Sequence, residues 1–383
     1  MQIVAVTWYA YKLTGSATSV GLLAALALGP TIVGSPIGGA LADRFELRRL
    51  AIVLYICQGI PAAAMAILDL TGELPIGWLY ALVFAGAIPF SLNSPVISLL
   101  GPYTVPEEYR RAALAQSSMM FNATRLVGAV GGGFIVHLFG IGPALAINAA
   151  SYFLVAAVLA TPTLFSAIGD IRPPESPERH TPDSGEAPKD AGSLSFMWLT
   201  AVSVGVFFTA IAPVEQLMPT VAEEHKMTAS AVGLLIGAIG MGAVLANPII
   251  ARTATSPARR RRLMALGMFL AAPGMIVLAV TPHHGIALDL MGALLIGFGW
   301  EFVFIGGQTA IATEVRHGIR GRMMGLFFVL VTATTAVGAV GLGMLISQVG
   351  LMTTFLATAT SAVVTGVVLL TLGSRIPTAA PET

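Results

Sequence analysis

Charged residues are scarce in this chain. They make up 10% of its 383 residues, whereas 56% are hydrophobic. A soluble domain carries about 25% charged residues, so these side chains are too few to cover a water-facing surface. The formal net charge of +1 gives no sign of a nucleic acid or other strongly charged partner. The composition therefore predicts an integral membrane protein.

Cysteine is nearly absent, and the motifs of several enzyme classes are missing. The one cysteine, Cys57, lies inside an apolar run, which excludes a disulfide framework and a thiolate metal cluster. The sequence contains neither G-x-x-x-x-G-K-[ST] nor H-E-x-x-H. His283 and His284 are adjacent but have no further ligands near them in sequence. We therefore expect no enzyme activity, no metal site and no cofactor.

Long apolar runs are what the chain does contain. A membrane-spanning helix needs about 20 mostly apolar residues. Such runs occur at 20–42, 50–69, 77–100, 112–140, 142–162, 194–218, 230–251, 263–281, 286–313, 323–348 and 351–372. A shorter apolar piece precedes them at 1–13. The pattern predicts an all-α integral membrane protein.

A polar segment rich in Pro, Asp, Glu and Ser separates the apolar runs into two similar halves, and its composition is typical of a flexible linker. The predicted domains are an N-terminal transmembrane bundle (1–162), a linker (163–193), a C-terminal transmembrane bundle (194–372) and a tail (373–383).

Lysine and arginine favour one set of alternate loops. Seventeen of the twenty fall on that set, beginning with Arg44, Arg48 and Arg49, while Lys12 and Lys226 fall on the other and Arg125 lies within a run. Cytoplasmic loops carry an excess of these residues. The linker and the C-terminus are therefore expected on the cytoplasmic side of the plasma membrane, the inner membrane of a bacterium.

The two halves repeat each other in sequence. At an offset of 212, residues 20–23 (VGLL) match residues 232–235 (VGLL), Pro36 matches Pro248, and Arg48 matches Arg260. Further along, at an offset of 210, Arg110 matches Arg320. Matches of proline and arginine are rarer by chance than matches of apolar residues. The chain is therefore expected to consist of two similar six-helix units in the same orientation.

The repeat leaves the first helix short. The run at 194–218 has its counterpart mostly before Met1. We therefore expect a first helix that is truncated at its N-terminus, and the alternative is a short first segment held by its neighbours.

These features together resemble the major facilitator superfamily. The pattern G-x-L-A-D-R follows the second helix, and its motif positions are Gly39, Leu41, Asp43, Arg44 and Arg48. Glu46 and Leu47 depart from the usual motif. This variant, with YKLTGSATSVGLL (11–23) and IRGRMMGL (319–326), is most similar to the exporter branch that includes enterobactin and macrolide exporters.

The resemblance implies a role for Asp43 in closing the cytoplasmic side. In the superfamily this acid interacts with the cytoplasmic end of the eleventh helix. Here that helix would offer a positive dipole end, with Arg320 and Arg322 beside it. The alternative is that Asp43 and its arginines only end a helix and set topology.

Two charges lie deep within predicted spans, Arg125 and Glu301. Each costs at least ~2.5 kcal/mol at mid-bilayer unless it has a partner. Burial disfavours the charged form of a carboxylate, which suits a proton carrier, and the resemblance implies that the tenth helix lines the central cavity. Glu301 is therefore the candidate for proton or cationic-substrate coupling. A structural ion pair, for example with Arg125, is the alternative, and Arg125 is equally a candidate for substrate contact.

Other polar residues are weaker candidates for the substrate cavity. Trp300 could stack on an aromatic or cationic ligand, while amide side chains also join helix to helix. Glu215 and Gln216 are expected to be exposed near an outer mouth, and Asp289 is expected to be solvated. The amide candidates are Asn93, Asn122 and Gln308.

A glycine-rich stretch, GAVGGG at 128–133, lies in the fifth predicted helix. Antiporters of the superfamily often carry a glycine-proline-glycine pattern there, but Ala129 stands at the proline position. Close helix packing and a hinge specific to antiport remain open as explanations.

The favoured function is proton-coupled export of a small amphiphilic molecule, such as a drug or siderophore, by a monomeric antiporter with alternating access. Import remains open, because the residues do not show direction. A non-transporting sensor or assembly partner with the same fold is the alternative from another class.

Overall fold

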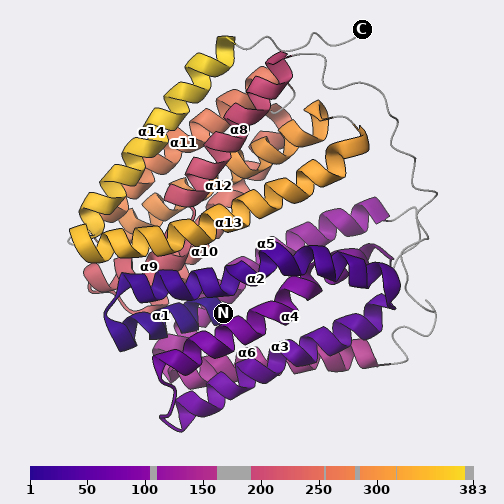
Figure 1. Cartoon of the computed structure of the whole chain (residues 1–383). Helices are drawn as coiled ribbons and strands as arrows, with labels where there is room; N and C mark the ends of the chain where they lie inside the picture. The colour runs from indigo at the N-terminus through magenta and orange to yellow at the C-terminus, as the bar shows by residue number, and fades with distance from the viewer. Residues whose placement is uncertain (104–109, 162–190, 254–255, 281–284, 316, 376–383) are drawn as a thin grey trace.

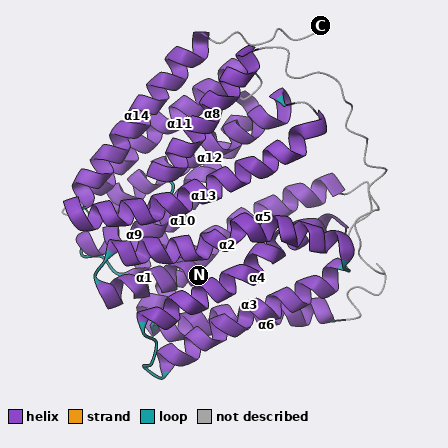
Figure 2. Cartoon of the chain, in the orientation of Figure 1, coloured by secondary structure: helices purple, strands orange, loops and turns teal. Residues whose placement is uncertain are grey.

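The structure is a computed structural model that describes residues 1–103, 110–161, 191–253, 256–280, 285–315 and 317–375. Most of the predicted linker (163–190), the end of the predicted tail, and both His283 and His284 lie outside this part of the chain. The last three residues of the predicted linker, 191–193, belong to a helix that begins at Ala191. In the described part every regular element is a helix, and short loops join the helices (Figure 2). The predicted all-α fold is confirmed.

The helices follow the apolar runs closely. They are α1 (Gln2–Thr14), α2 (Ala17–Arg44), α3 (Leu47–Leu70), α4 (Ile76–Tyr103), α5 (Arg110–Phe139), α6 (Ile141–Ala160), α8 (Ala191–Ala210), α9 (Val214–Glu224), α10 (Ala229–Thr253), α11 (Pro257–Val280), α12 (Ile286–Glu314), α13 (His317–Val349) and α14 (Leu351–Arg375). Ten spans among the described residues are long and apolar enough to cross a membrane, and α8 and α9 together form one of them. The eleventh predicted run is α5, whose described apolar part is Thr124–Phe139.

One predicted span is broken. The apolar run at 194–218 predicts a continuous helix, but α8 ends at Ala210 and α9 starts at Val214. The amides of Ile211 and Ala212 both donate to the Phe207 carbonyl, at 2.9 and 3.1 Å. Pro213 follows and has no backbone N–H to continue the helix. The break places Glu215 in the first turn of a new helix, where the positive end of the helix dipole favours an acid.

The helices pack mainly within their own half of the sequence. In the first half α3 packs on α4 and α6, and α2 packs on α4; in the second half α11 packs on α12 and α14, and α10 packs on α12. Two seams join the halves. In one, α2 packs against α13; in the other, α5 packs against α10 (Figure 1).

The sequence repeat appears in the structure as two equivalent seams. A Cβ at Gly21 would clash with the Ala339 carbonyl, and a Cβ at Gly233 would clash with the Ala129 carbonyl. Gly21 and Gly233 are 212 positions apart, and Ala129 and Ala339 are 210 apart, as in the repeat. The same relation holds for Gly343 against Ala17 and for Gly133 against Ala229. Close backbone contact at both seams therefore depends on glycine in the same repeat positions.

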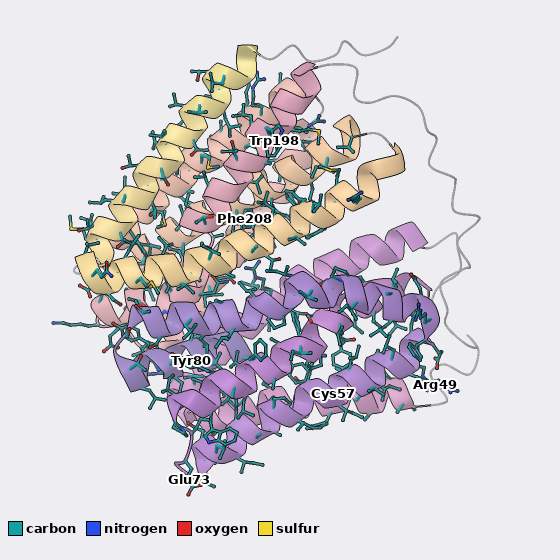
Figure 3. The ribbon with its side chains drawn as sticks, in the orientation of Figure 1. Arg49, Cys57, Glu73, Tyr80, Trp198 and Phe208 are labelled. Carbon is teal, nitrogen blue, oxygen red and sulfur yellow. The ribbon has the colours of Figure 1, made fainter. Side chains whose placement is uncertain are left out.

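These contacts gather at one end of the bundle, which we name the closed end. It carries the α1–α2 turn at Gly15, the α3–α4 loop at Glu73 and the α13–α14 turn at Gly350. The opposite end carries the arginines around Arg44–Arg49, and we name it the basic end. Figure 3 shows Glu73 and Arg49 at these opposite ends. From the closed end toward the basic end, α2 and α13 diverge (Figure 1).

Candidate functional site

An ion pair joins the two halves of the chain at mid-span. Arg125 of α5 donates from Nη2 to Oε2 of Glu215 at the start of α9. The Glu215 side chain is only 6% exposed, and that of Arg125 is 31% exposed. A buried acid without a partner would cost several kcal/mol. The sequence predicts a deep Arg125, and the broken seventh span brings its partner to it.

The indole ring of Trp300, on α12, lies against the guanidinium of Arg125. The guanidinium carbon lies 5.2 Å from the centroid of the indole ring, within the range of a cation–π contact. Phe208 of α8 meets the same ring edge-on, with the two centroids 5.2 Å apart. Phe304 lies beside Phe208, at 6.1 Å between centroids. The cation is therefore held between a carboxylate and an aromatic group.

Glu301 lies next to Trp300 and is the second acid of the group. Its Oε1 accepts a hydrogen bond of 3.1 Å from Nδ2 of Asn247 on α10. Glu301 also interacts electrostatically with Arg125. We name Arg125, Glu215, Asn247, Trp300 and Glu301 the central cluster. It contains one cation and two acids, so the charges do not balance when both acids are ionised.

The expectation of an exposed mouth at Glu215 and Gln216 is wrong. Both residues are buried, at 5% and 6% exposed. The reason is that α9 is surrounded, since it packs against α1, α2, α10 and α13. Tight packing of this kind cannot be read from the apolar run itself.

Asp289 is also not solvated as expected. It is fully buried in the first turn of α12, and its Oδ1 lies 3.3 Å from Nδ1 of His225, which follows α9. The pair fixes the end of α9 against α12. The pair lies near the closed end, because Asp289 is in the first turn of α12, whereas Glu301 is near the middle of that helix.

The remaining cavity candidates are dispersed. Asn93 is buried and lies beside Tyr55, within the first half. Gln308 is half-buried, two turns after Glu301 on α12. The side chain of Asn122 lies outside the described residues. Of the predicted polar candidates, the structure gathers Arg125, Glu215, Trp300 and Glu301 into one cluster.

The hinge residues lie at the basic end. Arg48 donates from Nε to the carbonyl of Leu159 at 2.6 Å, near the end of α6, and Arg49 pairs with Glu46 at 2.8 Å. Gly39 is half-buried, while Asp43, Arg44 and Arg322 are exposed. Among the described residues, Asp43 forms no ion pair, and the side chain of Arg320 lies outside them. Arg48 is therefore a structural contact between α3 and α6.

Polar contacts between the halves also occur at the closed end. Lys12 of α1 pairs with Glu223 of α9, with 2.7 Å between Nζ and Oε2. Thr18 of α2 contacts the Ser347 hydroxyl of α13 at 3.0 Å. Together with the glycine seams, these contacts join the two halves on this side.

Asn247 and His225 were not predicted. Asn247 is a lone polar side chain in the apolar stretch AVLANPII, and that was the only sequence signal available for it. His225 follows a polar EE pair and gives no signal of burial.

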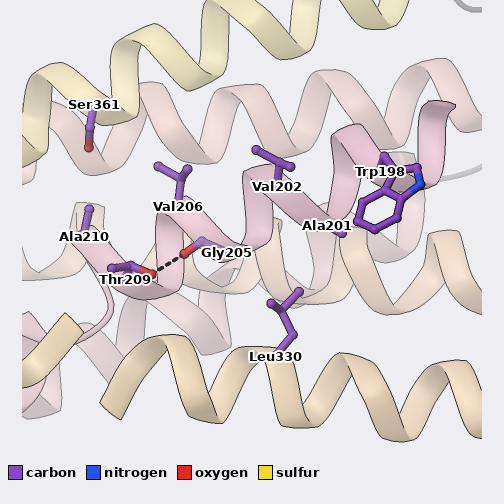
Figure 4. A pocket seen from close by; sticks show the side chains of 9 residues that line it. All are labelled: Trp198, Ala201, Val202, Gly205, Val206, Thr209, Ala210, Leu330 and Ser361. Atoms are coloured by element: carbon purple, nitrogen blue, oxygen red, sulfur yellow. Dashed lines mark hydrogen bonds between the residues drawn. The ribbon is translucent and has the colours of Figure 1, made fainter. Parts of the chain in front are cut away.

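Figure 4 shows an apolar groove of about 430 Å³, whose lining includes no residue of the central cluster. It runs along α8 from Trp198 past Gly205, between Leu330 of α13 and Ser361 of α14. The hydroxyl of Thr209 donates to the Gly205 carbonyl at 2.7 Å, and that of Ser361 donates to the Thr358 carbonyl at 2.7 Å. Its hydroxyls are thus used within their own helices, so the groove offers little to a polar substrate.

The family follows from comparison with known proteins. A family model described as "Transmembrane secretion effector", within the major facilitator group, matches residues 1–382. The chain belongs to the major facilitator superfamily. This confirms the resemblance that the hinge motif and the repeat predicted, and it makes the chain a membrane transporter of that type.

Curated relatives and solved structures are consistent with this assignment. The enterobactin exporters EntS of Shigella boydii serotype 18 and Escherichia coli O139:H28 are each 25% identical over 359 residues, covering 89% of this chain and 80% of the relative. The fold is similar to a crystal structure of the peptide transporter POT, with a TM-score of 0.75 at 15% identity over 98% of this chain and 91% of the other. It is also similar to a bacterial homologue of the lysosomal transporter Spinster in an inward-facing, occupied conformation, with a TM-score of 0.67 at 15% identity over 98% and 95%.

Proposed function

We propose that the protein exports a small amphiphilic molecule in exchange for protons, by alternating access between two bundles, residues 1–162 and 194–372. One observation carries this proposal. Arg125 of the first bundle pairs with Glu215 of the second. The second acid, Glu301, interacts with the same arginine and has no cation of its own in the central cluster. Ions at mid-membrane are expensive and in transporters mark the path of ions or substrate.

The excess negative charge of the central cluster suits an exchange of protons for substrate. With both acids ionised, the central cluster has a net charge of −1. Adding a proton to Glu301, or placing a cationic group of the substrate beside it, restores balance. A proton and a substrate that compete for the same carboxylate give antiport, because each must leave before the other binds.

The orientation follows from the arginines. If the basic end is cytoplasmic, as the distribution of lysine and arginine predicts, the closed end faces outward and the conformation is inward-facing. The linker and the C-terminus are then cytoplasmic. In the opposite state the basic end must close, and Asp43 would pair with Arg320 or Arg322 at the start of α13, where the helix dipole also favours an acid.

Export rather than import is supported by the relatives, which are named as exporters of enterobactin. The aromatic rings of Phe208, Trp300 and Phe304 beside the central cluster suit a substrate with an apolar, aromatic part.

The test is proton-driven uptake into inverted vesicles of a host that lacks its own exporters. Enterobactin, erythromycin and ethidium serve as probes, with Glu301→Gln against wild type. Glu73→Gln, at an exposed loop of the closed end, is the matched control. We expect uptake by wild type and by Glu73→Gln that an uncoupler abolishes, and at least a tenfold lower rate for Glu301→Gln. No uptake of any probe by a stably inserted wild type would favour a non-transporting partner or an importer.

A further inference from the structure

Helix α9 carries a polar stripe that is buried except at its end. Gln216, Thr220 and Glu223 follow each other at spacings of four and three, which places them on one face of a helix. Gln216 and Thr220 are only 6% and 3% exposed. Polar side chains of this kind are rarely buried without a reason.

Two atoms of the stripe lack hydrogen-bond partners. Oε1 of Gln216 and Oγ1 of Thr220 are buried, and no group in the described part of the chain bonds to them. Leaving a buried polar atom unpaired costs about 1–3 kcal/mol. Buried polar atoms of native proteins are satisfied by the protein or by ordered water, so water beside this face of α9 would satisfy both atoms.

The stripe faces the other half of the chain. Glu223 pairs with Lys12 of α1, so the face that carries Gln216 and Thr220 turns toward the seam between the halves. The Glu223 and Lys12 side chains are 41% and 47% exposed, which makes this pair the outer mouth of the stripe. At the inner end, Gln216 directly follows Glu215, the partner of Arg125. From Glu215 to Glu223 the helix rises about 12 Å.

We propose that water held along Gln216 and Thr220 forms a proton path from the Lys12–Glu223 mouth at the closed end to Glu215 in the central cluster. The proposal rests on the proton coupling proposed above and adds the route. A threonine hydroxyl can both donate and accept, and a glutamine oxygen accepts, so the two residues support a continuous chain of water.

The proton step links the path to exchange. An excess proton reaches the last water of the path as hydronium. The hydronium gives this proton to the carboxylate of Glu215, which becomes a neutral acid, and the hydronium is left as a water molecule. Arg125 then has Glu301 as its remaining ionised partner, and the central cluster is electrically neutral. Passing the proton on to Glu301 restores the Arg125–Glu215 pair and gives the protonated Glu301 of the proposed exchange. The path therefore acts on the ion pair between the bundles while the closed end stays shut to substrate.

Other titratable groups surround the mouth. Tyr11 of α1 lies near Glu223 and Glu224, His225 and Asp289 pair on the α12 side, and Lys226 follows in the loop. The charged residues of α2, α10 and α13 all lie near the basic end. Within the buried part of the stripe, between Glu223 and Glu215, the polar groups are Thr220 and Gln216.

The test compares two threonines, Thr220 and Thr200, whose hydroxyls are both buried without a hydrogen-bond partner among the described residues. Thr220→Val removes the hydroxyl of the stripe. Thr200→Val is the matched control, because the Thr200 hydroxyl of α8 is also buried without a partner but lies outside the stripe. Thr220→Ser restores a hydroxyl. Each variant is purified into liposomes with a pH dye inside and tested with whichever of enterobactin, erythromycin and ethidium the wild type moves fastest.

We expect Thr220→Val to lower proton movement driven by the probe at least tenfold, while probe exchange without a proton gradient stays within twofold of wild type. The thermal midpoint should change little, because valine has nearly the shape of threonine and no group of the described residues bonds to the Thr220 hydroxyl. Thr200→Val and Thr220→Ser should keep both rates.

Proton movement by Thr220→Val within twofold of wild type would overturn the path and leave the proposed antiport intact. A loss of proton movement matched by an equal loss in Thr200→Val would also overturn it. A wild type that exchanges the probe but moves no protons would instead overturn the proton coupling on which the path depends.

Discussion

Arg125 is the residue on which the central cluster depends, because it is the only cation within reach of two acids there among the described residues. Its guanidinium is also shared with the Trp300 ring. Arg125 neutralises Glu215 in the structure, and in the proposed exchange it also responds when one of the two acids is protonated. The two roles are separable by experiment.

Removing Arg125 alone should destabilise the protein more than removing the whole ion pair. We expect Arg125→Gln to cost about 3 kcal/mol, because it leaves Glu215 buried and unpaired. The double variant Arg125→Gln/Glu215→Gln should recover most of that loss. Thermal unfolding of the detergent-purified variants measures both.

Transport should be lost in both variants, since both remove the ion pair between the bundles. Equal melting temperatures for the single and double variants would show that Glu215 does not depend on Arg125 for its charge.

At the scale of helices, the proposed alternating access requires the two seams to open when the bundles move. Each depends on glycine where a backbone carbonyl of the other half lies against it, Ala129 facing Gly233 and Ala339 facing Gly21. The GAVGGG stretch contributes Ala129 and Gly133 to one of these seams, which supports close packing as its role.

A large side chain in a seam should hold the closed end open. We expect Gly233→Leu to increase the distance between spin labels at Thr14 and Gln348 by several Å and to abolish transport, because the leucine cannot fit against the Ala129 carbonyl. Electron–electron distance measurement between the two labels gives the change in distance, in a Cys57→Ser background so that the native cysteine is not labelled. Gly29→Leu is the control, since a side chain there meets nothing within 4 Å.

An unchanged distance in a folded Gly233→Leu protein would contradict a closed end that depends on this seam.

For the whole molecule, the balance between the two states is expected to depend on Asp43. In the present conformation it is exposed and forms no ion pair with the described residues. If it pairs with Arg320 or Arg322 only when the basic end closes, it stabilises the other state alone.

Asp43→Asn should therefore shift the population toward the conformation described here. We expect the Thr14–Gln348 label distribution to narrow around its short distance, and the transport rate to fall at least fivefold. Glu46→Gln, which removes an acid three residues away that pairs with Arg49, should change neither by as much. If Asp43→Asn instead has the transport rate and the Thr14–Gln348 label distances of the wild type, Asp43 acts only in setting topology.

Much of the fold follows from local composition. The predicted runs and the helices agree to within a few residues at most ends, for example 351–372 against Leu351–Arg375. Apolar length decides which segments can cross a membrane, and this is a property of each segment by itself. Pro213 can also be read from the sequence. Whether a proline kinks or breaks an apolar helix, however, depends on whether neighbouring helices or water can bond to the backbone groups that it leaves free.

The central cluster was predicted only in part. Arg125 and Glu301 stand out because a charge within an apolar run is costly wherever it lies. Glu215 appears in sequence as a polar residue near the end of a span, and it was assigned to an exposed mouth. Its burial comes from helices that are distant in sequence and close around α9.

The sequence by itself determined that this chain lies in a membrane, that it repeats, and that it belongs to a transporter superfamily, because hydropathy, charge distribution and motif spacing are carried by single segments. Only the tertiary structure decided which acid Arg125 meets, which seams the glycines form, and that Gln216 and Thr220 are buried together. These contacts join residues up to 326 positions apart, as for Ala17 and Gly343. Packing across the two halves, rather than any local pattern, decides which residues become partners.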